Sequence, residues 1–358
     1  MYGRVRFVKV VRKLFSPLLS ALLLALLTAA LLGASSTSQG SSLAVASHPA
    51  LSARFSASPV PPTPSPDTML APAAPATTFL GMDEDLLLER LRSAEIRSVH
   101  FSRGGSSLTL RVEFVDGSRA AFKPQQVHPQ SVPRKEAAAY LLSRKLGISA
   151  VPPTVMRSLS RDELLQKLDA ESQFLRPRLV REAIFDARGL TTGSMMYWVP
   201  GLLDLGLDRE RAILQWTAEL SQTGSLPKER EAILSQLSTL LLFDVIQNNS
   251  DRFSGGNILG LRDGSRLFFI DNAFGFQTDP IGHKRALGYL SRCQKFSHTL
   301  WTQLQLLRDE QLSFDDPVYG PLLSDEEIRA LRSRRDRAVH YLGQLIHSHG
   351  VPSVLAFQ

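Results

Sequence analysis

The chain has 358 residues, and its 41 Lys and Arg against 34 Asp and Glu give a formal net charge of +7. The first 79 residues hold six basic side chains and one acidic one, so only +2 remains on the rest, which argues against a nucleic-acid-binding protein. Because Cys293 is the single cysteine of the chain, no internal disulfide can form.

The N-terminus combines a basic segment, residues 1–13, with an uncharged apolar run, residues 14–33. The run is long enough to span a bilayer, and its basic flank predicts that the first segment stays cytoplasmic. Small residues at 30–34 leave a cleaved signal peptide open as the alternative to a signal anchor. In either case we expect the rest of the chain outside the cytoplasm, in a Golgi lumen or a bacterial periplasm or exterior. It would then be a single-pass membrane protein held by the N-terminal helix, or a secreted one.

Residues 34–78 are rich in Ser, Pro, Ala and Thr and contain the run Pro-Val-Pro-Pro-Thr-Pro-Ser-Pro at 59–66. This composition predicts a disordered, partly polyproline stalk. Residues 79–358 remain for folding, which is enough for one large core or two lobes.

A β-hairpin is the first element predicted in this part. Apolar residues at 108, 110, 112 and 114 alternate with polar ones, Asp116-Gly117 marks a turn, and residues 119–123 return as the paired strand. Lys123 stands at the end of that strand. Gly104 and Gly105 precede the hairpin in a short turn whose backbone N–H groups could cover phosphates.

A helix is predicted over residues 133–146, ended by Gly147. Glu136 lies in its first turn, where an acidic residue commonly serves only the helix dipole. In kinases, however, a strand lysine holds the nucleotide phosphates and a helix glutamate positions that lysine. Lys123 and Glu136 stand in that order, so we expect Glu136 to reach back to Lys123.

Two aspartates follow a strongly apolar helical segment around residues 237–243, which is too short for a second membrane span. Asp251 lies in the polar loop after it, Asn257 ends that loop, and a hairpin whose second strand is predicted over residues 266–270 delivers Asp271. Each aspartate alone is typical of a turn or a local ion pair. Together they match a kinase site, in which one aspartate orients the acceptor hydroxyl, and the other, with the asparagine, holds the metal ion.

The last predicted helix begins with the capping box Ser324 to Glu327 and repeats apolar residues at helical spacing up to Ile346. Basic residues cluster on it at 329–337. A solvated outer face is the favoured interpretation of this cluster, over a patch for an acidic substrate or a lipid headgroup.

The ordered set of motifs resembles the secretory-pathway kinases of the Four-jointed and Golgi casein kinase family. The resemblance covers most of residues 79–358, and it rests on Gly104-Gly-Ser-Ser-Leu-Thr-Leu, Phe122-Lys-Pro, Glu136-Ala-Ala-Ala-Tyr, Val151-Pro-Pro, Gly193-Ser with Val199-Pro, Leu242-Phe-Asp-Val-Ile, Asp251-Arg and Ile270-Asp-Asn.

The resemblance implies a role for each matching position. Lys123 and Glu136 correspond to the nucleotide-positioning pair, Asp251 to the catalytic aspartate and Asp271 to the metal aspartate. Residues 193–200 correspond to the hinge that packs against adenine, with Ser194, Met195 and Met196 as nucleotide-binding residues. The substitution of the glutamate that marks the family's pseudokinase is absent.

Three features depart from the family pattern. The metal-side partner usually comes five residues after the catalytic aspartate, where this chain has Gly256, and Asn257 follows one later. The disulfides of animal members cannot form, and their extensions are missing. These departures suggest a bacterial-type relative.

The sequence thus predicts an α+β, two-lobed, atypical protein-kinase-like fold: a sheet with one helix over residues 79–190 and a mostly helical lobe over residues 191–358. ATP with Mn²⁺ or Mg²⁺ would lie between the lobes, and the γ-phosphate would pass to a hydroxyl, preferably Ser or Thr, of an extracytoplasmic protein. A glycan kinase and a lipid kinase like the type II phosphatidylinositol 4-kinases remain as alternatives. So does a pseudokinase scaffold that binds nucleotide or a partner protein.

Overall fold

The computed structural model describes residues 78–102 and 106–358. The predicted basic segment, apolar run and stalk up to residue 77, as well as Gly104 and Gly105, lie outside the described residues, whereas Thr78, the last residue of the predicted stalk, is part of a strand. In chain order the strands and α-helices are β1 Thr78–Phe79, β2 Met82–Asp83, α3 Glu84–Ser93, β3 Ile96–Phe101, β4 Leu110–Phe114, β5 Arg119–Pro124, α4 Pro133–Lys145, β6 Thr154–Ser160, α5 Arg161–Gln166, α6 Arg176–Glu182, β7 Leu190–Tyr197, β8 Leu203–Asp204, α7 Glu210–Glu219, α8 Glu231–Gln247, β9 Leu259–Gly260, β10 Leu267–Phe268, α9 Lys284–Leu290, α10 His298–Leu306, β11 Asp315–Asp316, β12 Gly320–Pro321, α11 Asp325–His349 and α12 Val351–Val354.

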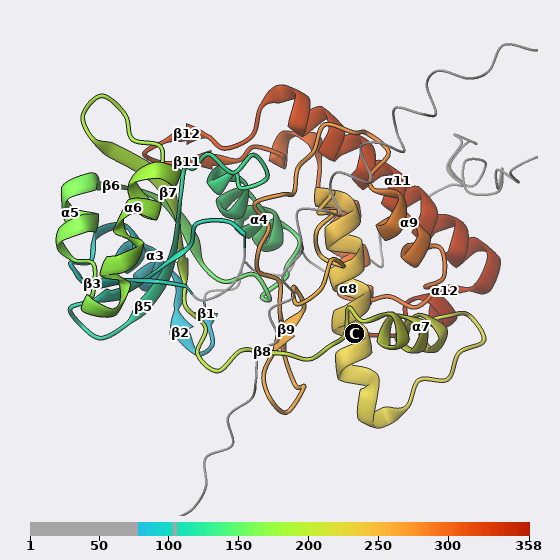
Figure 1. Ribbon diagram of the computed structural model, residues 1–358. Helices are drawn as coiled ribbons and strands as arrows, with labels where there is room; N and C mark the ends of the chain where they lie inside the picture. Colours follow the sequence, from blue (N-terminus) through green and yellow to red (C-terminus); the bar gives the residue numbers. More distant parts are fainter. Residues whose placement is uncertain (1–77, 103–105) are drawn as a thin grey trace, which may run out of the picture. The chain divides into compact units, whose positions relative to one another are not determined.

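The main sheet has five strands in the order β3-β4-β5-β7-β6, and every neighbouring pair is antiparallel. In Figure 1 the sheet lies on the left together with α5 and α6. The helices α7, α8, α9, α11 and α12 lie on the right. The predicted hairpin is confirmed as β4 and β5, which pair from Leu110 with Phe122 to Glu113 with Arg119. Its loop spans residues 115–118 and is longer than the predicted Asp116-Gly117 turn.

Two details of the N-terminal half differ from the sequence prediction. Strand β7 lies between β5 and β6, so the sheet extends past residue 190, where the sequence prediction placed the lobe boundary. Three α-helices besides α4 accompany the sheet, where one helix was predicted. The first of them, α3, begins where the Asp83 side chain accepts a hydrogen bond from the Leu86 N–H, and it buries Leu87 and Leu91.

Helix α4 confirms the predicted helix and joins the sheet to the helical part. Pro133 occupies its first turn, and the run of small residues Ala137 to Ala139 is buried. The helix packs on β6 and β7. Gly147 follows it with φ of 67°, a left-handed conformation that suits glycine after a helix C-terminus.

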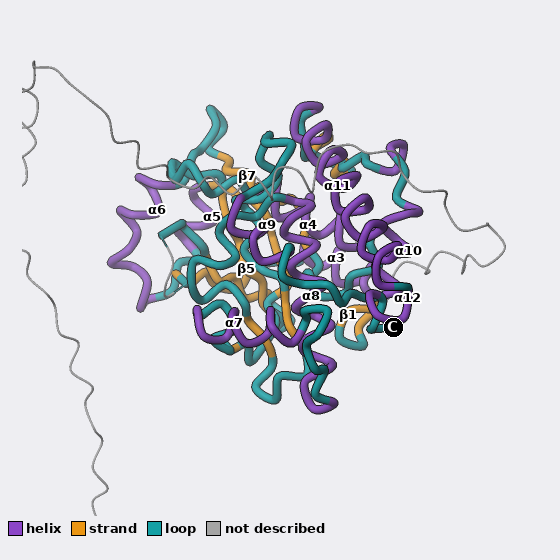
Figure 2. The backbone as a smooth tube through the Cα atoms, turned by 90° about the vertical axis from the view of Figure 1, so that its right-hand side faces the viewer, coloured by secondary structure: helices purple, strands orange, loops and turns teal. Residues whose placement is uncertain are grey.

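Helix α8 is the centre of the C-terminal half. It is buried almost all round between Leu237 and Gln247, and it packs against α9 and α11. Figure 2 shows α10, α11 and α12 gathered on one side of the described chain. None of the helices in residues 78–102 and 106–358 is both long and apolar enough to cross a membrane.

The capping box that opens α11 is confirmed, but the predicted solvated face is wrong for two of its arginines. Arg334 is fully buried and Arg335 is buried. The Arg334 guanidinium donates to the carbonyl oxygens of Ile246 (2.8 Å), Gln277 (2.8 Å) and Asp279 (2.5 Å). Burial lowers the pKa of Arg334 to about 10. Its partners lie at the C-terminal end of α8 and in the loop before α9, far away in the sequence, so local spacing could not identify them.

Candidate active site

Lys123 pairs with two carboxylates. Its Nζ donates to Glu136 Oε1 at 2.6 Å and to Asp271 Oδ1 at 2.7 Å. Burial alone would lower the pKa of Lys123, but the Glu136 and Asp271 carboxylates raise it above its ordinary value. In return, Lys123 lowers the pKa of Asp271. Both groups are therefore charged at neutral pH.

Local structure brings these three side chains together. The end of β5 supplies Lys123, the first turn of α4 supplies Glu136, and the segment after β10 supplies Asp271. The second oxygen of Glu136 accepts a hydrogen bond from the Asn272 N–H at 2.8 Å, so this carboxylate holds the lysine and the aspartate segment at once. Asp271 has φ of 59°, a left-handed conformation that costs a residue other than glycine about 1–3 kcal/mol.

A buried arginine, whose role the sequence analysis missed, organises the loop. Arg252 is fully buried and forms an ion pair with the equally buried Asp244 of α8, at 2.9 Å. Its guanidinium also donates to Asn272 Oδ1 at 2.6 Å, to the Asn257 carbonyl at 3.0 Å and to the Ile270 carbonyl. Arg252 thus ties α8, the loop and the segment after β10, which carries Asp271, into one network.

Asn249 connects the two aspartates. Its Nδ2 donates to the Asp271 carbonyl at 3.2 Å, and its Oδ1 accepts from the Asp251 N–H at 3.2 Å. Asn249 is fully buried, so the bridge is shielded from water. The only sequence signal for this role is a position two residues before Asp251.

Asn257 lies against Asp251 despite its displaced position in the sequence. Its Nδ2 donates to the Asp251 carbonyl at 2.9 Å and to Asp251 Oδ2 at 3.3 Å. Gly255 and Gly256 precede it with φ of 115° and 77°, a left-handed backbone that glycine adopts readily. These glycines accommodate the extra residue of the loop.

A cavity of about 470 Å³ adjoins this network, within the size range of small-ligand sites. Lys123, Glu136, Ser194, Met196, Asn257 and Asp271 line it from the predicted set. Trp198, also in the lining, belongs to the predicted hinge, residues 193–200, whereas the sequence analysis did not predict Ala121, Pro152, Leu202, Leu259 and Ile270 as site residues. Most of these are apolar, so the cavity has an apolar part as well as the charged part around Lys123.

Two predicted site residues within the described ranges do not line the cavity. Met195 has no exposed surface and belongs to the apolar core on the other side of the sheet. Side chains of a strand alternate between faces, so Ser194 and Met196 point into the cavity and Met195 points away from it. Asp251 does not line the cavity, but its carboxylate accepts a hydrogen bond from the side-chain amide of Asn257, which does.

The donor set of Asp271 and Asn257 fits a hard divalent cation. The Asp271 side chain is 46% exposed, so its carboxylate remains accessible beside Lys123. Carboxylate and amide oxygens are ligands that Mg²⁺ and Mn²⁺ prefer, and such ions usually take further ligands from phosphates and water. Within the described ranges, no three His, Cys, Asp or Glu residues are grouped to hold a metal by themselves. The arrangement therefore suits a metal that arrives with a phosphate ligand.

An antiparallel sheet with a strand lysine, a helix glutamate paired to it, and an aspartate-bearing loop in a helical half define a two-lobed, protein-kinase-like α+β fold. Solved structures of the Golgi casein kinase match this fold. One of them matches with a TM-score of 0.59 and 18% identity. The match covers 76% of this chain and 77% of the chain in that structure. The structure with Mn and ADP bound has a TM-score of 0.58 and 17% identity, with coverage of 76% and 78%. Hydra Fam20 with sugar has a TM-score of 0.59 and 17% identity, with coverage of 78% and 95%.

The sequence comparison points the same way. The human extracellular serine/threonine protein kinase FAM20C is 21% identical over 329 residues, which cover 76% of this chain and 56% of that protein. The chain thus matches little more than half the length of this relative. No family model matches the chain. Sequence and fold together confirm the resemblance to Fam20-like secretory kinases.

Proposed function

We propose that this chain is an exported or membrane-anchored kinase that transfers the γ-phosphate of ATP to a hydroxyl of an extracytoplasmic protein. The observation that carries the proposal is the pairing of one buried lysine with both Glu136 and Asp271 at the wall of a nucleotide-sized cavity. A lysine held by a helix glutamate is the arrangement with which kinases position nucleotide phosphates.

The cavity offers a place for each part of the nucleotide. Its apolar part, with Ala121, Leu202 and Ile270, suits the base, while the Lys123 ammonium suits the phosphates. Asp271 and Asn257 would hold Mn²⁺ or Mg²⁺. A bound metal would neutralise charge on the β- and γ-phosphates.

Asp251 is the proposed catalytic aspartate. Its backbone N–H is held by Asn249, and its carboxylate accepts from the Asn257 amide, so its position is fixed from two sides. It would orient the acceptor hydroxyl and take its proton. The bond between the γ-phosphorus and the β–γ bridging oxygen breaks as the bond to the acceptor oxygen forms, and ADP leaves. The protein contributes positioning and charge compensation, because the transition state is loose.

The relatives support a choice of nucleotide, metal and acceptor. A Golgi casein kinase structure holds Mn and ADP, and the human relative is named as an extracellular serine/threonine protein kinase. We therefore favour ATP, Mn²⁺ and a Ser or Thr hydroxyl. A sugar hydroxyl is the second candidate, because hydra Fam20 was solved with a sugar. The division into a basic segment, an anchor or signal peptide, a stalk and two lobes is part of the same proposal.

The test is transfer of labelled γ-phosphate by the purified chain in Mn²⁺ or Mg²⁺. The acceptors would be casein, a xylose-containing linker sugar and phosphatidylinositol. Label on casein supports the protein kinase, and label on the sugar alone would replace it by the glycan kinase. Nucleotide binding with no transfer to any acceptor or to water would leave the scaffold interpretation instead.

A further inference from the structure

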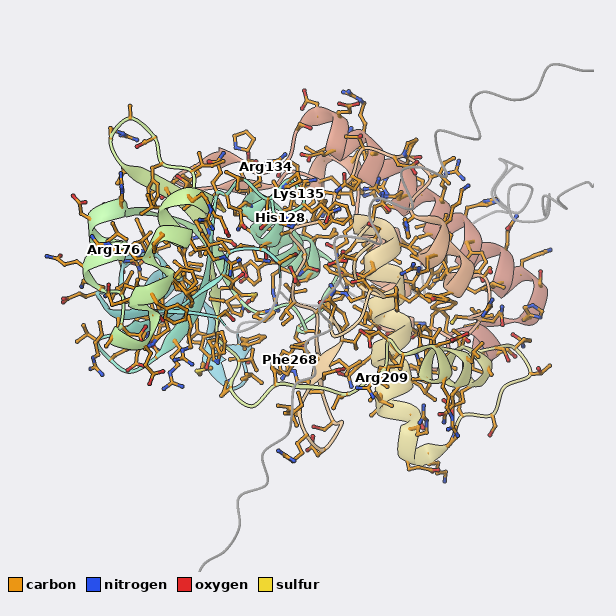
Figure 3. The ribbon with its side chains drawn as sticks, in the orientation of Figure 1. His128, Arg134, Lys135, Arg176, Arg209 and Phe268 are labelled. Carbon is orange, nitrogen blue, oxygen red and sulfur yellow. The ribbon has the colours of Figure 1, made fainter. Side chains whose placement is uncertain are left out.

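A second cavity, of about 400 Å³, opens at the N-terminus of α4 and shares no lining residue with the nucleotide cavity. Its walls come from four parts of the chain: residues 125–134, Met156 of β6, Thr192 of β7, and the β11–β12 region around Tyr319 and Pro321. Figure 3 shows His128, Arg134 and Lys135 close together around this end of α4. Nothing in the proposed transfer reaction uses this cavity.

The helix end at this cavity carries no side-chain cap. The N-cap residue of α4 is Val132, which has no side chain able to accept a hydrogen bond, and Pro133 follows it without an N–H. The acidic residue of the first turn, Glu136, is bound to Lys123 and to the Asn272 N–H. The Lys135 N–H donates to the Val132 carbonyl at 3.1 Å, and the partial positive charge at this end of the 13-residue helix favours an anion beside it.

Two polar side chains of the wall have unused hydrogen-bonding atoms. Ser131 is 6% exposed, and its buried Oγ has no hydrogen-bond partner in the part of the chain that the structure describes. The same holds for the buried Nδ1 of His128. The Ser131 N–H donates to the His128 carbonyl at 3.1 Å, so one turn carries both side chains. A buried hydroxyl without a partner is costly, and a ligand that accepts hydrogen bonds would remove that cost.

The charges around the cavity favour an anion. Arg134 donates to both oxygens of Glu327, at 2.7 and 3.0 Å, and Lys135 contacts the same carboxylate at 3.2 Å, so two cations share one carboxylate. The nearby Asp316 is not a lining residue, and its carboxylate accepts from the backbone N–H groups of Met156, Val318 and Tyr319. No Asp or Glu is among the described residues that line the cavity.

We propose that this cavity binds a phosphate-type oxyanion, either inorganic phosphate or the phosphate monoester of a phosphorylated side chain. The α4 N-terminus and the Ser131 hydroxyl would donate to its oxygens, and His128 would contribute an N–H. The same turn of α4 carries Glu136, so an occupied site would hold the carboxylate that pairs with Lys123. The inference goes beyond the proposed transfer reaction, and its test needs no turnover.

The test is calorimetric titration and thermal unfolding of the full chain with inorganic phosphate and with a phosphoserine peptide, at constant ionic strength. Wild type should bind with saturation and rise in Tm. Ser131→Ala and His128→Ala should bind at least tenfold more weakly. Without ligand, Ser131→Ala should be at least as stable as wild type, because the lost hydroxyl has no partner. Ser93→Ala, an exposed serine of α3, is the matched control.

The two probes separate the sources of the anion, since tighter binding of the peptide or of the free ion identifies which one occupies the cavity. Absence of saturable binding to wild type would overturn the proposal. Equal affinity in wild type, Ser131→Ala and His128→Ala would also overturn it, because the phosphate would then bind elsewhere.

Discussion

Replacing Arg252 by methionine should destabilise the whole fold. Both members of the Arg252–Asp244 pair have no exposed side-chain surface, so the substitution leaves a carboxylate buried without its counter-ion. Loss of one partner of such a pair costs about 3–5 kcal/mol. Arg252 also donates to Asn257, Ile270 and Asn272, and each acceptor left unsatisfied adds about 1 kcal/mol before any relaxation. We therefore expect a loss of about 4 kcal/mol or more in the free energy of unfolding.

Urea unfolding followed by circular dichroism measures this loss, and a double-mutant cycle isolates the pair. Asp244→Leu combined with Arg252→Met removes both charges, so the double variant should be more stable than the sum of the single losses predicts, by about 1–3 kcal/mol. The exposed pair of Arg188 and Asp186 is the control, and Arg188→Met should leave the urea midpoint at the wild-type value. A loss below about 1 kcal/mol for Arg252→Met, or strict additivity in the cycle, would refute the reasoning.

Three further predictions concern the site and the core. Glu136→Gln should lower kcat/KM by about 100-fold, because Lys123 loses a charged partner. The control Glu89→Gln, on the exposed face of α3, should leave kcat/KM unchanged, and steady-state kinetics measures kcat/KM for both variants. The Lys123 pKa is raised and the Asp271 pKa is lowered, so the stability that their pairing contributes should be constant from about pH 5 to pH 9. This stabilisation should be lost as the pH falls through the lowered pKa of Asp271 or rises through the raised pKa of Lys123. The difference in unfolding free energy between wild type and Asp271→Asn, measured across pH, checks the expectation. A steady change of that difference between about pH 5 and pH 9 would contradict it. Cys293 is fully buried, and burial raises the pKa of its thiol to about 12. Iodoacetamide at about pH 8 should therefore label Cys293 only after denaturation, as read by mass spectrometry. Rapid labelling of the native chain would disprove the burial.

The elements that carry Lys123 and Glu136 could be predicted because their signals are local. Alternating apolar residues specify β4, the Asp116-Gly117 turn signal places β5 after it, and the proline at 133 with the glycine at 147 delimits α4. Their contact is a matter of tertiary packing, and the resemblance to a known family pointed to it. The loop between Asp251 and Asn257 was predicted to be one residue longer than the family pattern. Gly255 and Gly256, both in a left-handed conformation, accommodate the additional residue.

Other features depend on contacts between distant segments, which no local pattern reveals. Arg252 and Arg334 both look like surface arginines in sequence, yet Arg252 donates to the Ile270 carbonyl, 18 residues away, and Arg334 to the Ile246 carbonyl, 88 residues away. Met195 was grouped with its neighbours Ser194 and Met196, although strand alternation alone would have placed it on the opposite face. The predicted lobe boundary at residue 190 separated β7 from the sheet to which it belongs. Local patterns could not assign β7 to that sheet, because its partners β5 and β6 lie far back in the sequence.

The most direct test of the account is Mn²⁺-dependent phosphate transfer by three forms of the chain: wild type, Asp251→Asn and the control Asp263→Asn. Asp263 is an exposed turn residue whose carboxylate accepts from the Ser265 N–H and hydroxyl. We predict that Asp251→Asn keeps the fold and the nucleotide affinity of wild type but transfers at least 100-fold more slowly, while Asp263→Asn transfers at the wild-type rate. Transfer by Asp251→Asn at the wild-type rate would contradict the assignment of the catalytic aspartate.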